Sequence, residues 1–370
     1  MTTTKVQGIE AIRGALAMTV FLCHGWIIFV GSGSTTGVGA LHSTLNVVSR
    51  FAVVFFFVVS GFVIAMTIDR NRQRGFRAAD YWVSRVARIA PPMLATIGIT
   101  FALYLVLLYS ETYYVSWGNA ERGAYYTDPF TQLLALVTVT LAGDLQGGGF
   151  NGPLWSLTFE IQLYVVAGLL AVLAFGRWKL LALLALAAYL WAVAATSIEV
   201  GKPRQLGMAA CFAAGAAAYM LRRTRTRVVI VLIAASLAAL APQLPWRNAH
   251  RLLDTPGWLL FQVLAACLFA EAVVAVSRTH RLDRWSWLGA SSFTLYILHF
   301  PMLLAIYFVA FNVKRELVFG WPGYATAMLA VSIVFCVSVR VARAVERPAA
   351  CRTWLLALWA RVRSPAPSAA

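Results

Sequence analysis

The feature that most constrains this chain is a succession of long apolar runs separated by short segments rich in Arg and Lys. Runs of about 20 apolar residues match the hydrocarbon thickness of a bilayer. Hydrophobic residues make up 61% of the chain and charged residues only 12%, whereas a soluble domain carries about 25% charged residues. So much apolar sequence would leave large exposed patches on a soluble protein. The sequence therefore predicts an integral membrane protein.

Ten apolar runs are long enough to be spans, and each should be helical because lipid offers no hydrogen-bond partner to an open backbone. The expected fold is all-α, a polytopic transmembrane helix bundle of about ten spans. The first run is too long for a cleavable signal peptide and is expected to be a span. The predicted spans are 9–30, 51–68, 92–110, 154–175, 180–197, 205–221, 228–241, 257–276, 287–311 and 323–345.

The basic residues predict the orientation, because cytoplasmic loops carry an excess of Arg and Lys. With both termini in the cytoplasm, 23 of the 31 basic residues lie inside and 8 outside. Residues 69–91 and 222–227 are then cytoplasmic. The apolar stretch 130–142 is too short to span, so 111–153 is expected to be one external segment with an interfacial or re-entrant helix. The net charge of +17 reflects these loops and does not indicate nucleic-acid binding.

The cysteines indicate neither a disulfide framework nor a metal site. They are odd in number, lie mostly in apolar runs and include no Cys-x-x-Cys pair. No metal is therefore expected. The cysteines are Cys23, Cys211, Cys267, Cys336 and Cys351.

Polar residues inside spans are costly and are functional candidates by default. The first span carries Glu10, Arg13 and His24. Arg13 and His24 lie 11 residues apart, about three helical turns, so they share a face about 16.5 Å apart along the axis. Glu10 can pair with Arg13 from three residues before it. This pattern suits a ligand with a charged head and a reactive tip, although a snorkelling Arg and a structural His would give the same pattern.

Two further segments offer candidates for ligand binding. Ser60 and Gly61 are small residues in a bulky aromatic run, which is typical of close helix packing and also admits a ligand. Arg85 and Arg88 lie three residues apart in a segment where Pro91 is expected to open the next helix. Paired guanidinium groups suit phosphates, although cytoplasmic loops favour Arg in any case.

Two later spans carry further polar groups. Glu160 and Tyr164, at positions i and i+4, face the same way near the expected external mouth. There, Glu160 can orient an acceptor hydroxyl or support His24. His299 lies two residues before Pro301, which frees the carbonyl of Ile297 and is expected to kink the helix. Each group also has a purely structural interpretation.

Together these motifs resemble the acyltransferase 3 family of bacterial integral-membrane O-acyltransferases, over about residues 8–350. The chain departs from the common pattern at Ala52, often Gly in the family, and at Val54, where many members carry Asp. The resemblance implies an acyltransferase 3 transmembrane domain at 1–350 and a cytoplasmic amphipathic tail at 351–370, without a C-terminal hydrolase-like domain. The matching motifs are Arg13-x10-His24, the Phe-Phe-x-x-Ser-Gly-Phe run ending at Phe62, Arg85-x-x-Arg88 with Pro91, Leu154-Trp155-Ser156-Leu157 with Glu160 and Tyr164, Leu295 to Pro301, and Glu346-Arg347-Pro348.

The resemblance implies transfer of an acyl group, usually acetyl, from cytoplasmic acyl-CoA to a hydroxyl of a glycan, a lipid-linked sugar or a related acceptor, in the bacterial inner membrane. His24, Glu160 and His299 are then the expected catalytic residues. Arg13, Ser60, Arg85 and Arg88 are the expected donor-binding residues. His24 can act as general base on the acceptor hydroxyl, since imidazole takes up a proton near neutral pH, or can accept the acyl group itself.

Two other function classes compete with this interpretation. A proton-coupled transporter or lipid flippase would use Glu10, Glu160, His24 and Glu271 as a relay, but the sequence shows no inverted repeat of the kind that many transporters carry. A membrane scaffold without catalysis would leave the aligned Arg13 and His24 without a purpose. The expected partners are therefore acyl-CoA, a hydroxyl-bearing acceptor and membrane lipids, without nucleic acid.

Overall fold

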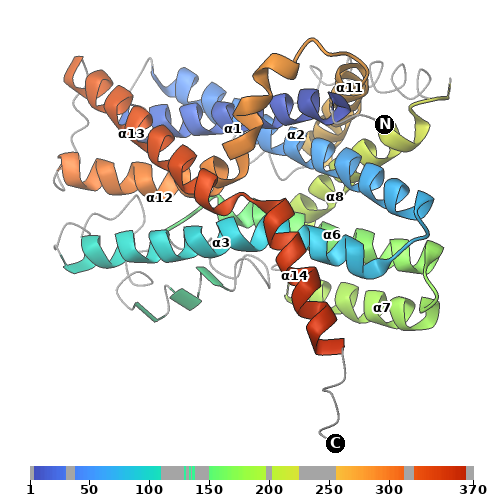
Figure 1. Ribbon diagram of the computed structural model, residues 1–370. Helices are drawn as coiled ribbons and strands as arrows, with labels where there is room; N and C mark the ends of the chain where they lie inside the picture. Colours follow the sequence, from blue (N-terminus) through green and yellow to red (C-terminus); the bar gives the residue numbers. More distant parts are fainter. Residues whose placement is uncertain are drawn as a thin grey trace, which may run out of the picture.

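The protein is described by a computed structural model of the 370-residue chain, in which elongated helices lie side by side (Figure 1). The structure describes residues 4–30, 38–109, 150–196, 202–224, 256–311 and 321–363, with a few positions between 129 and 137. All regular structure within these ranges is helical. The helices are α1 (Thr4–Phe29), α2 (Val38–Gln73), α3 (Ala78–Tyr109), α6 (Leu154–Phe175), α7 (Lys179–Thr196), α8 (Lys202–Leu221), α11 (Pro256–Ser277), the 3₁₀ helix η4 (Asp283–Ser291), α12 (Ser292–Phe311), α13 (Trp321–Val345) and α14 (Pro348–Arg363).

The helices follow the apolar runs, as expected of a polytopic bundle. Nine of the ten predicted spans coincide with helices, and the seventh, 228–241, lies outside the described residues. Within the described residues, six helices are long and apolar enough to cross a bilayer, and α7, α8 and α11 contain shorter apolar stretches. Most of the proposed interfacial segment 130–142 also lies outside the described residues.

Two helices are longer than the sequence predicted. The expected span 51–68 is the central part of α2, which has 36 residues. The turns before this part carry several polar residues between His42 and Arg50, of which Asn46 and Ser49 donate to backbone carbonyls of the preceding turn. α3 begins at Ala78, so the prediction that Pro91 opens this helix is wrong: Pro91 and Pro92 lie inside it. Arg85 and Arg88 therefore belong to a continuous helix and not to a loop.

Reciprocal glycine contacts hold two pairs of helices unusually close. A Cβ atom on Gly61 of α2 would lie 1.9 Å from the carbonyl oxygen of Phe212 in α8, and one on Gly215 would lie 1.9 Å from that of Val58. Gly14 of α1 similarly meets the backbone of η4. The Ser60-Gly61 pair thus serves two purposes, because Gly61 packs against α8 while Ser60 hydrogen-bonds to Glu160 of α6.

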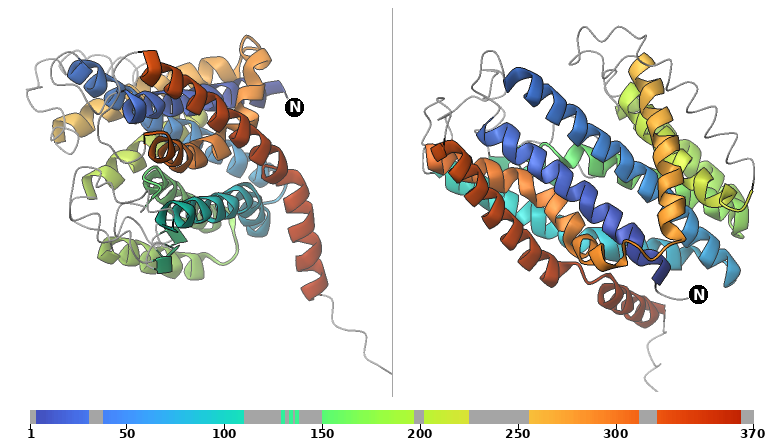
Figure 2. Two further views of the ribbon diagram at one scale, coloured as in Figure 1. Left: turned by 90° about the vertical axis from the view of Figure 1, so that its left-hand side faces the viewer. Right: turned by 90° about the horizontal axis from the view of Figure 1, so that it is seen from above.

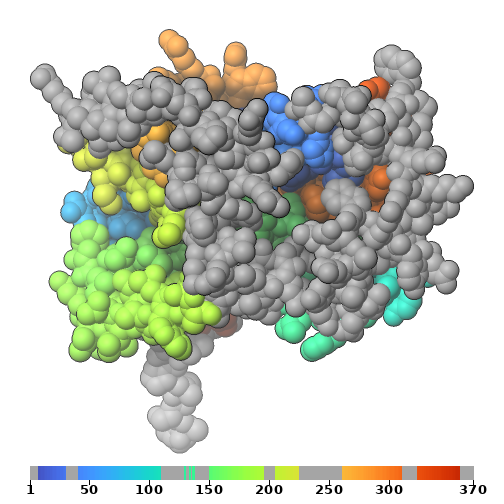
Figure 3. All heavy atoms as spheres, turned by 180° about the vertical axis from the view of Figure 1, so that it is seen from behind, coloured from blue at the N-terminus to red at the C-terminus, as the bar shows by residue number. Residues whose placement is uncertain are grey.

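The outer surface of the bundle is apolar, as expected for contact with lipid. On the face shown in Figure 3, α7 (light green) lies at the surface. Its side chains include Leu180, Leu184 and Trp191, which are 70%, 59% and 74% exposed. An exposed row of this kind is typical of a lipid-facing helix and would be a liability in water.

The basic helix ends meet at one end of the bundle. Asp69 at the end of α2 accepts a hydrogen bond from Tyr219 of α8 (2.9 Å) and pairs with Arg222 (3.8 Å), whose carbonyl accepts a hydrogen bond from Arg278 after α11. Asp80 at the start of α3 pairs with Arg352 of α14 at 3.3 Å. In the right panel of Figure 2, α14 lies at the same end as the N-terminus. Segments that were all predicted to be cytoplasmic thus lie together.

Because these segments lie together, the predicted orientation in the membrane can be tested at two of them at once. In a variant whose native cysteines are replaced, single cysteines at the exposed positions Arg74 and Thr224 should resist an impermeant thiol reagent in intact cells and react after permeabilisation. A cysteine at Trp117, in the segment expected outside, should react in intact cells. Because the structure places Arg74 and Thr224 at the same end, labelling of only one of them in intact cells would contradict the fold. Labelling of both would reverse the orientation.

Candidate active site

The first helix carries three polar side chains, as the sequence predicted. Arg13 lies 3.5 Å from Glu10, so the expected ion pair is present. Helix geometry separates Arg13 and His24 by about 16.5 Å along one face. Each of them meets a different part of the protein: Arg13 lines a cavity with residues of α3 and α6, whereas His24 meets α12.

His24 forms a pair with the other histidine predicted at the site. His24 Nδ1 lies 2.8 Å from His299 Nε2, and the two rings are nearly parallel, with centroids 5.1 Å apart and planes 12° apart. His299 is fully buried, whereas His24 is partly exposed. The sequence predicted the two histidines as separate candidates, and the structure joins them in one unit.

The hydrogen bonds of the pair determine which ring nitrogen of each histidine carries a proton. His299 Nδ1 lies 3.1 Å from the carbonyl oxygen of Leu295, which can only accept, so Nδ1 carries the proton. In a neutral His299, Nε2 is then an acceptor, and His24 must donate to it from Nδ1. Two adjacent imidazolium cations in an apolar interior would be costly, which favours the neutral pair. The lone pair on His24 Nε2 is thus left available to take a proton from another molecule.

Aromatic rings and a buried amide hold this pair in place. Phe21 meets the His299 ring edge-on at 5.9 Å, and Phe300 meets His24 at 5.4 Å. Pro301 lies inside α12 and cannot donate to Ile297. Asn151, fully buried just before α6, donates to that carbonyl at 2.8 Å. The free carbonyl predicted from the proline is therefore satisfied from another segment.

A cavity of about 40 Å³ brings together the residues predicted to bind the donor. Its polar lining comes from α1, α2, α3, α6 and α12, and aromatic and valine side chains cover the rest. Arg85 lies with its guanidinium carbon 5.7 Å from the centre of the Tyr164 ring, and its buried Nε has no hydrogen-bond partner among the described residues. The lining includes Arg13, Ser60, Arg85, Arg88, Ser156, Glu160, Tyr164, Ser292, Phe56, Phe57, Phe293 and Tyr296.

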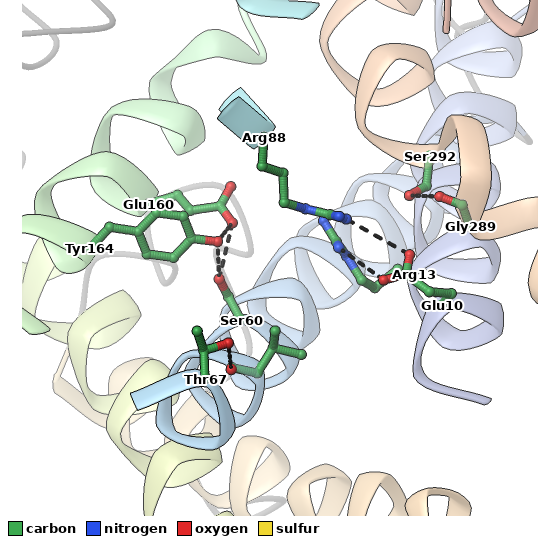
Figure 4. Close-up of polar contacts among 10 residues, drawn as sticks. Glu10, Arg13, Ser60, Thr67, Arg88, Glu160, Tyr164, Gly289 and Ser292 are labelled. Atoms are coloured by element: carbon green, nitrogen blue, oxygen red, sulfur yellow. Dashed lines mark hydrogen bonds and ion pairs between the residues drawn. The ribbon is translucent and has the colours of Figure 1, made fainter. Parts of the chain in front are cut away.

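Glu160 lies on this same cavity, which corrects its predicted position near the external mouth. Its Oε1 accepts hydrogen bonds from the Tyr164 hydroxyl and from Ser60 Oγ at 3.0 Å, and Ser60 Oγ lies 2.8 Å from the Tyr164 oxygen (Figure 4). Phe150 and Asn151 are buried, so α6 begins inside the protein. Glu160 is therefore a neighbour of the arginine residues, and the partner of His24 is His299.

Tyr296 connects the cavity with the histidine pair. Its ring lies 5.3 Å from that of Phe56 and 6.1 Å from that of His299, and its hydroxyl lies 2.6 Å from Ser156 Oγ. Tyr296 lines the cavity, whereas neither histidine does. The site thus has a cationic part and an imidazole part on either side of this tyrosine.

Sequence reasoning assigned no role to three residues that support the site. Asn151 and Tyr296 are the first two, and their contacts reach across elements far apart in the chain. Glu346 is the third: its Oε1 accepts a hydrogen bond from the backbone N–H of Thr294 at 2.8 Å. A carboxylate at a helix N-terminus stabilises unpaired N–H groups. Pro301 indicated that the carbonyl of Ile297 lacks a partner in its own helix, but the sequence did not identify Asn151 as the donor that satisfies it.

The described part of the chain offers no cluster of three or more His, Cys, Asp or Glu side chains that could hold a metal ion. The polar groups gathered at the site are the imidazole pair, the carboxylate of Glu160 and the guanidinium groups of Arg13, Arg85 and Arg88.

Comparison with known proteins identifies the family to which this chain belongs. Residues 6–341 match the sequence profile of the acyltransferase 3 family, which is described as an acyltransferase domain. The chain belongs to the acyltransferase 3 family. This match covers nearly the whole chain, from the first turn of α1 to the last turns of α13. Membership and the apolar helices together indicate a multi-pass membrane protein of this family.

One curated relative supports the same assignment at greater distance. The chain is 28% identical over 161 residues to the acyltransferase MdmB of Streptomyces mycarofaciens. The match covers 44% of this chain and 38% of that protein. No solved structure matches the chain.

Proposed function

We propose that this acyltransferase 3 protein is an O-acyltransferase that moves an acyl group, most simply acetyl, from cytoplasmic acyl-CoA to a hydroxyl of a glycan, a lipid-linked sugar or a related acceptor. The observation that carries the proposal is the placement of Arg13 and His24 on one helix. Arg13 joins a cationic cavity, and His24, about 16.5 Å further along, joins a hydrogen-bonded imidazole pair. This arrangement fits a donor with a phosphate-bearing head and a thioester at the end of a narrow arm.

In this proposal the arginine residues hold the phosphates of the donor. Guanidinium groups suit phosphate because they are planar, always charged and able to donate two parallel hydrogen bonds. Arg13, Arg85 and Arg88 line one cavity, and Ser60 adds a hydroxyl there. The arm of the donor then passes the aromatic wall at Phe56 and Tyr296 towards the histidine pair. The basic end of the bundle, with both chain termini, faces the cytoplasm of a bacterium whose inner membrane holds the protein.

The histidine pair supplies the base. His24 Nε2 takes the proton of the acceptor hydroxyl as the oxygen attacks the thioester carbonyl, and the coenzyme leaves as a thiol after accepting a proton. General-base assistance of this kind contributes about 10² to 10⁴ in rate. His299 determines which nitrogen of His24 carries the proton. Its Nδ1–H donates to the Leu295 carbonyl, so its Nε2 accepts the hydrogen bond from His24 Nδ1.

A transporter or flippase would need a connected relay of titratable groups. Three of the four residues that the sequence suggested for it bond to other groups and not to one another: Glu10 pairs with Arg13 and Arg88, Glu160 bonds to Ser60 and Tyr164, and His24 bonds to His299. Membership of an acyltransferase family also favours catalysis over transport.

Labelled acetyl-CoA tests the proposal directly. Membranes containing the protein should transfer radiolabel from [acetyl-¹⁴C]acetyl-CoA to a glycan or lipid fraction, and membranes containing the variant His24→Ala should not. Comparison of surface glycans from cells with and without the protein then identifies the acceptor. Absence of protein-dependent transfer to any fraction, with all tested acyl-CoA donors, would refute the proposed reaction.

The donor site leads to a second prediction. Arg88→Ala should raise the KM for acetyl-CoA about tenfold or more, because a hydrogen bond to a charged group contributes about 1.5 to 3 kcal/mol. The maximal rate should change less. Arg72→Ala is the matched control: Arg72 lies at the same end of the bundle but is 57% exposed and does not line the cavity. Equal effects of the two substitutions would remove Arg88 from the donor site.

A further inference from the structure

Glu10 has no role in the proposed reaction, although it lies beside two of the arginine residues. Its Oε1 lies 3.5 Å from Arg13, and its Oε2 lies 3.7 Å from Arg88, which reaches across from α3 (Figure 4). One carboxylate thus meets two guanidinium groups, each of which lines the cavity, although Glu10 itself is not part of the lining. It occupies the place that an anionic ligand would take between the two arginine residues.

The geometry of these contacts is that of a weak interaction. Both distances are long for a charge-assisted hydrogen bond, and each guanidinium uses one oxygen rather than a bidentate pair. The side chains of Glu10 and Arg88 are each 26% exposed, so solvent screens their attraction. A phosphate group, which offers several oxygens and more charge, can replace this carboxylate.

The packing of α1 depends on the backbone and Cβ of Glu10, which lie against Gly289 of η4, and not on its carboxylate. The helix is held against η4, where Gly14 and Gly289 bring the two backbones together, and against α2 and α12. The Glu10 carboxylate therefore restrains the two arginine side chains, while glycine contacts and buried apolar residues hold the helix. Removing the charge of Glu10 should release Arg13 and Arg88 without separating the helices.

The charges around these groups favour an incoming anion once Glu10 is displaced. Arg85 adds a third guanidinium, whose buried Nε has no hydrogen-bond partner among the described residues. Glu160, on the opposite wall, has Oε1 engaged by two hydroxyl groups. Arg13 also interacts electrostatically with Glu160 and with Glu346. Three cations thus face carboxylates that are already engaged by protein groups.

We propose that Glu10 sets the affinity of the donor site, because its carboxylate occupies the anion position between Arg13 and Arg88 until a phosphate group of the donor displaces it. The identity of that donor as acyl-CoA rests on the proposed function. A donor with several phosphates compensates for the lost Glu10 contacts, whereas a thioester without phosphates does not displace the carboxylate. Glu10 therefore lowers the affinity for every anion and leaves the affinity for uncharged thioesters unchanged.

The variant Glu10→Gln tests this displacement by binding, with Asp80→Asn as the matched control. Asp80 pairs with Arg352 at the same end of the bundle and does not line the cavity. The purified full-length protein in detergent is titrated with CoA, with inorganic pyrophosphate and with S-acetylpantetheine. Glu10→Gln should bind CoA and pyrophosphate about 3- to 10-fold more tightly, as expected for the loss of two partly exposed ion pairs. Binding of S-acetylpantetheine should not change, and Asp80→Asn should behave as the wild type.

Unchanged or weaker binding of pyrophosphate by Glu10→Gln would overturn the proposal, because it would mean that Glu10 orients the arginine residues and does not compete with the ligand. Undetectable pyrophosphate binding in both proteins would overturn it as well. Tighter pyrophosphate binding without any CoA binding would support the role of Glu10 and refute acyl-CoA as the donor. Glu10→Ala is the second variant, with the same expected result; loss of the folded protein in both variants would assign Glu10 to structure and overturn the proposal.

Discussion

Replacing His24 with Ala is expected to lower acyl transfer by about 10² to 10⁴, the usual contribution of a general base. The reason is geometric as well as chemical. His24 is the partly exposed member of the pair, and its Nε2 is the nitrogen left without a proton by the hydrogen bonds from Leu295 through His299. The measurement is the initial rate of label transfer from acetyl-CoA, with expression and CoA binding shown to be unchanged.

Substitutions of His299 separate positioning from direct catalysis. His299→Ala should cost about tenfold, the rate equivalent of one hydrogen bond of about 1.4 kcal/mol. His299→Gln can accept from His24 and donate to Leu295, so it should recover part of this loss, which a mere packing role would not predict. Near-normal transfer by His24→Ala would refute the assignment. A selective loss in His299→Ala, with His24→Ala active, would move the base to His299.

Gly61→Ala is expected to reduce the amount of folded protein sharply and to lower its Tm in detergent. The added Cβ would lie 1.9 Å from the carbonyl oxygen of Phe212, which is backbone and cannot rotate away. α2 and α8 would have to separate, and overpacking of this kind costs about 1 to 3 kcal/mol or more. The measurement is thermal unfolding followed by size-exclusion chromatography.

Gly98→Ala is the matched control, because it makes the same change in a helix. A Cβ atom at Gly98 of α3 meets no atom within 4 Å, and Ala favours a helix over Gly by about 1 kcal/mol. This variant should be as stable as the wild type or more stable. If Gly61→Ala were equally well tolerated, the close approach of α2 and α8 would be contradicted.

The sequence predicted the helices well and their ends less well. Lipid forces each apolar run into a helix, so 257–276 and 323–345 nearly coincide with α11 and α13. Hydropathy gives no signal where a helix continues beyond the lipid, as in the turns of α2 that precede residue 51. In α3 the signal was misleading: a proline is favourable in the first turn, yet Pro91 and Pro92 lie well inside the helix, Pro92 buried against its neighbours.

The sequence predicted only those relations in the site that lie within one helix. Arg13 and His24 share a face because 3.6 residues make a turn, and the Glu10–Arg13 pair follows from the same periodicity. The bond between His24 and His299 could not be predicted, because residues 275 apart in sequence are related only by tertiary packing. Glu160 was placed too far out, because the sequence does not show that α6 begins beside the buried Asn151.

The hydrogen bond between the two histidines can form only late in the synthesis of the chain. His24 enters the membrane with the first helix, but its partner leaves the ribosome 275 residues later. The helix that bears His299 receives its N-terminal carboxylate only when Glu346 has been made, near the end of the chain. Contacts of such large sequence separation form late. A nascent chain that stops before α12 therefore has every arginine of the cavity but only one of the two histidines, so it is expected to lack the activity.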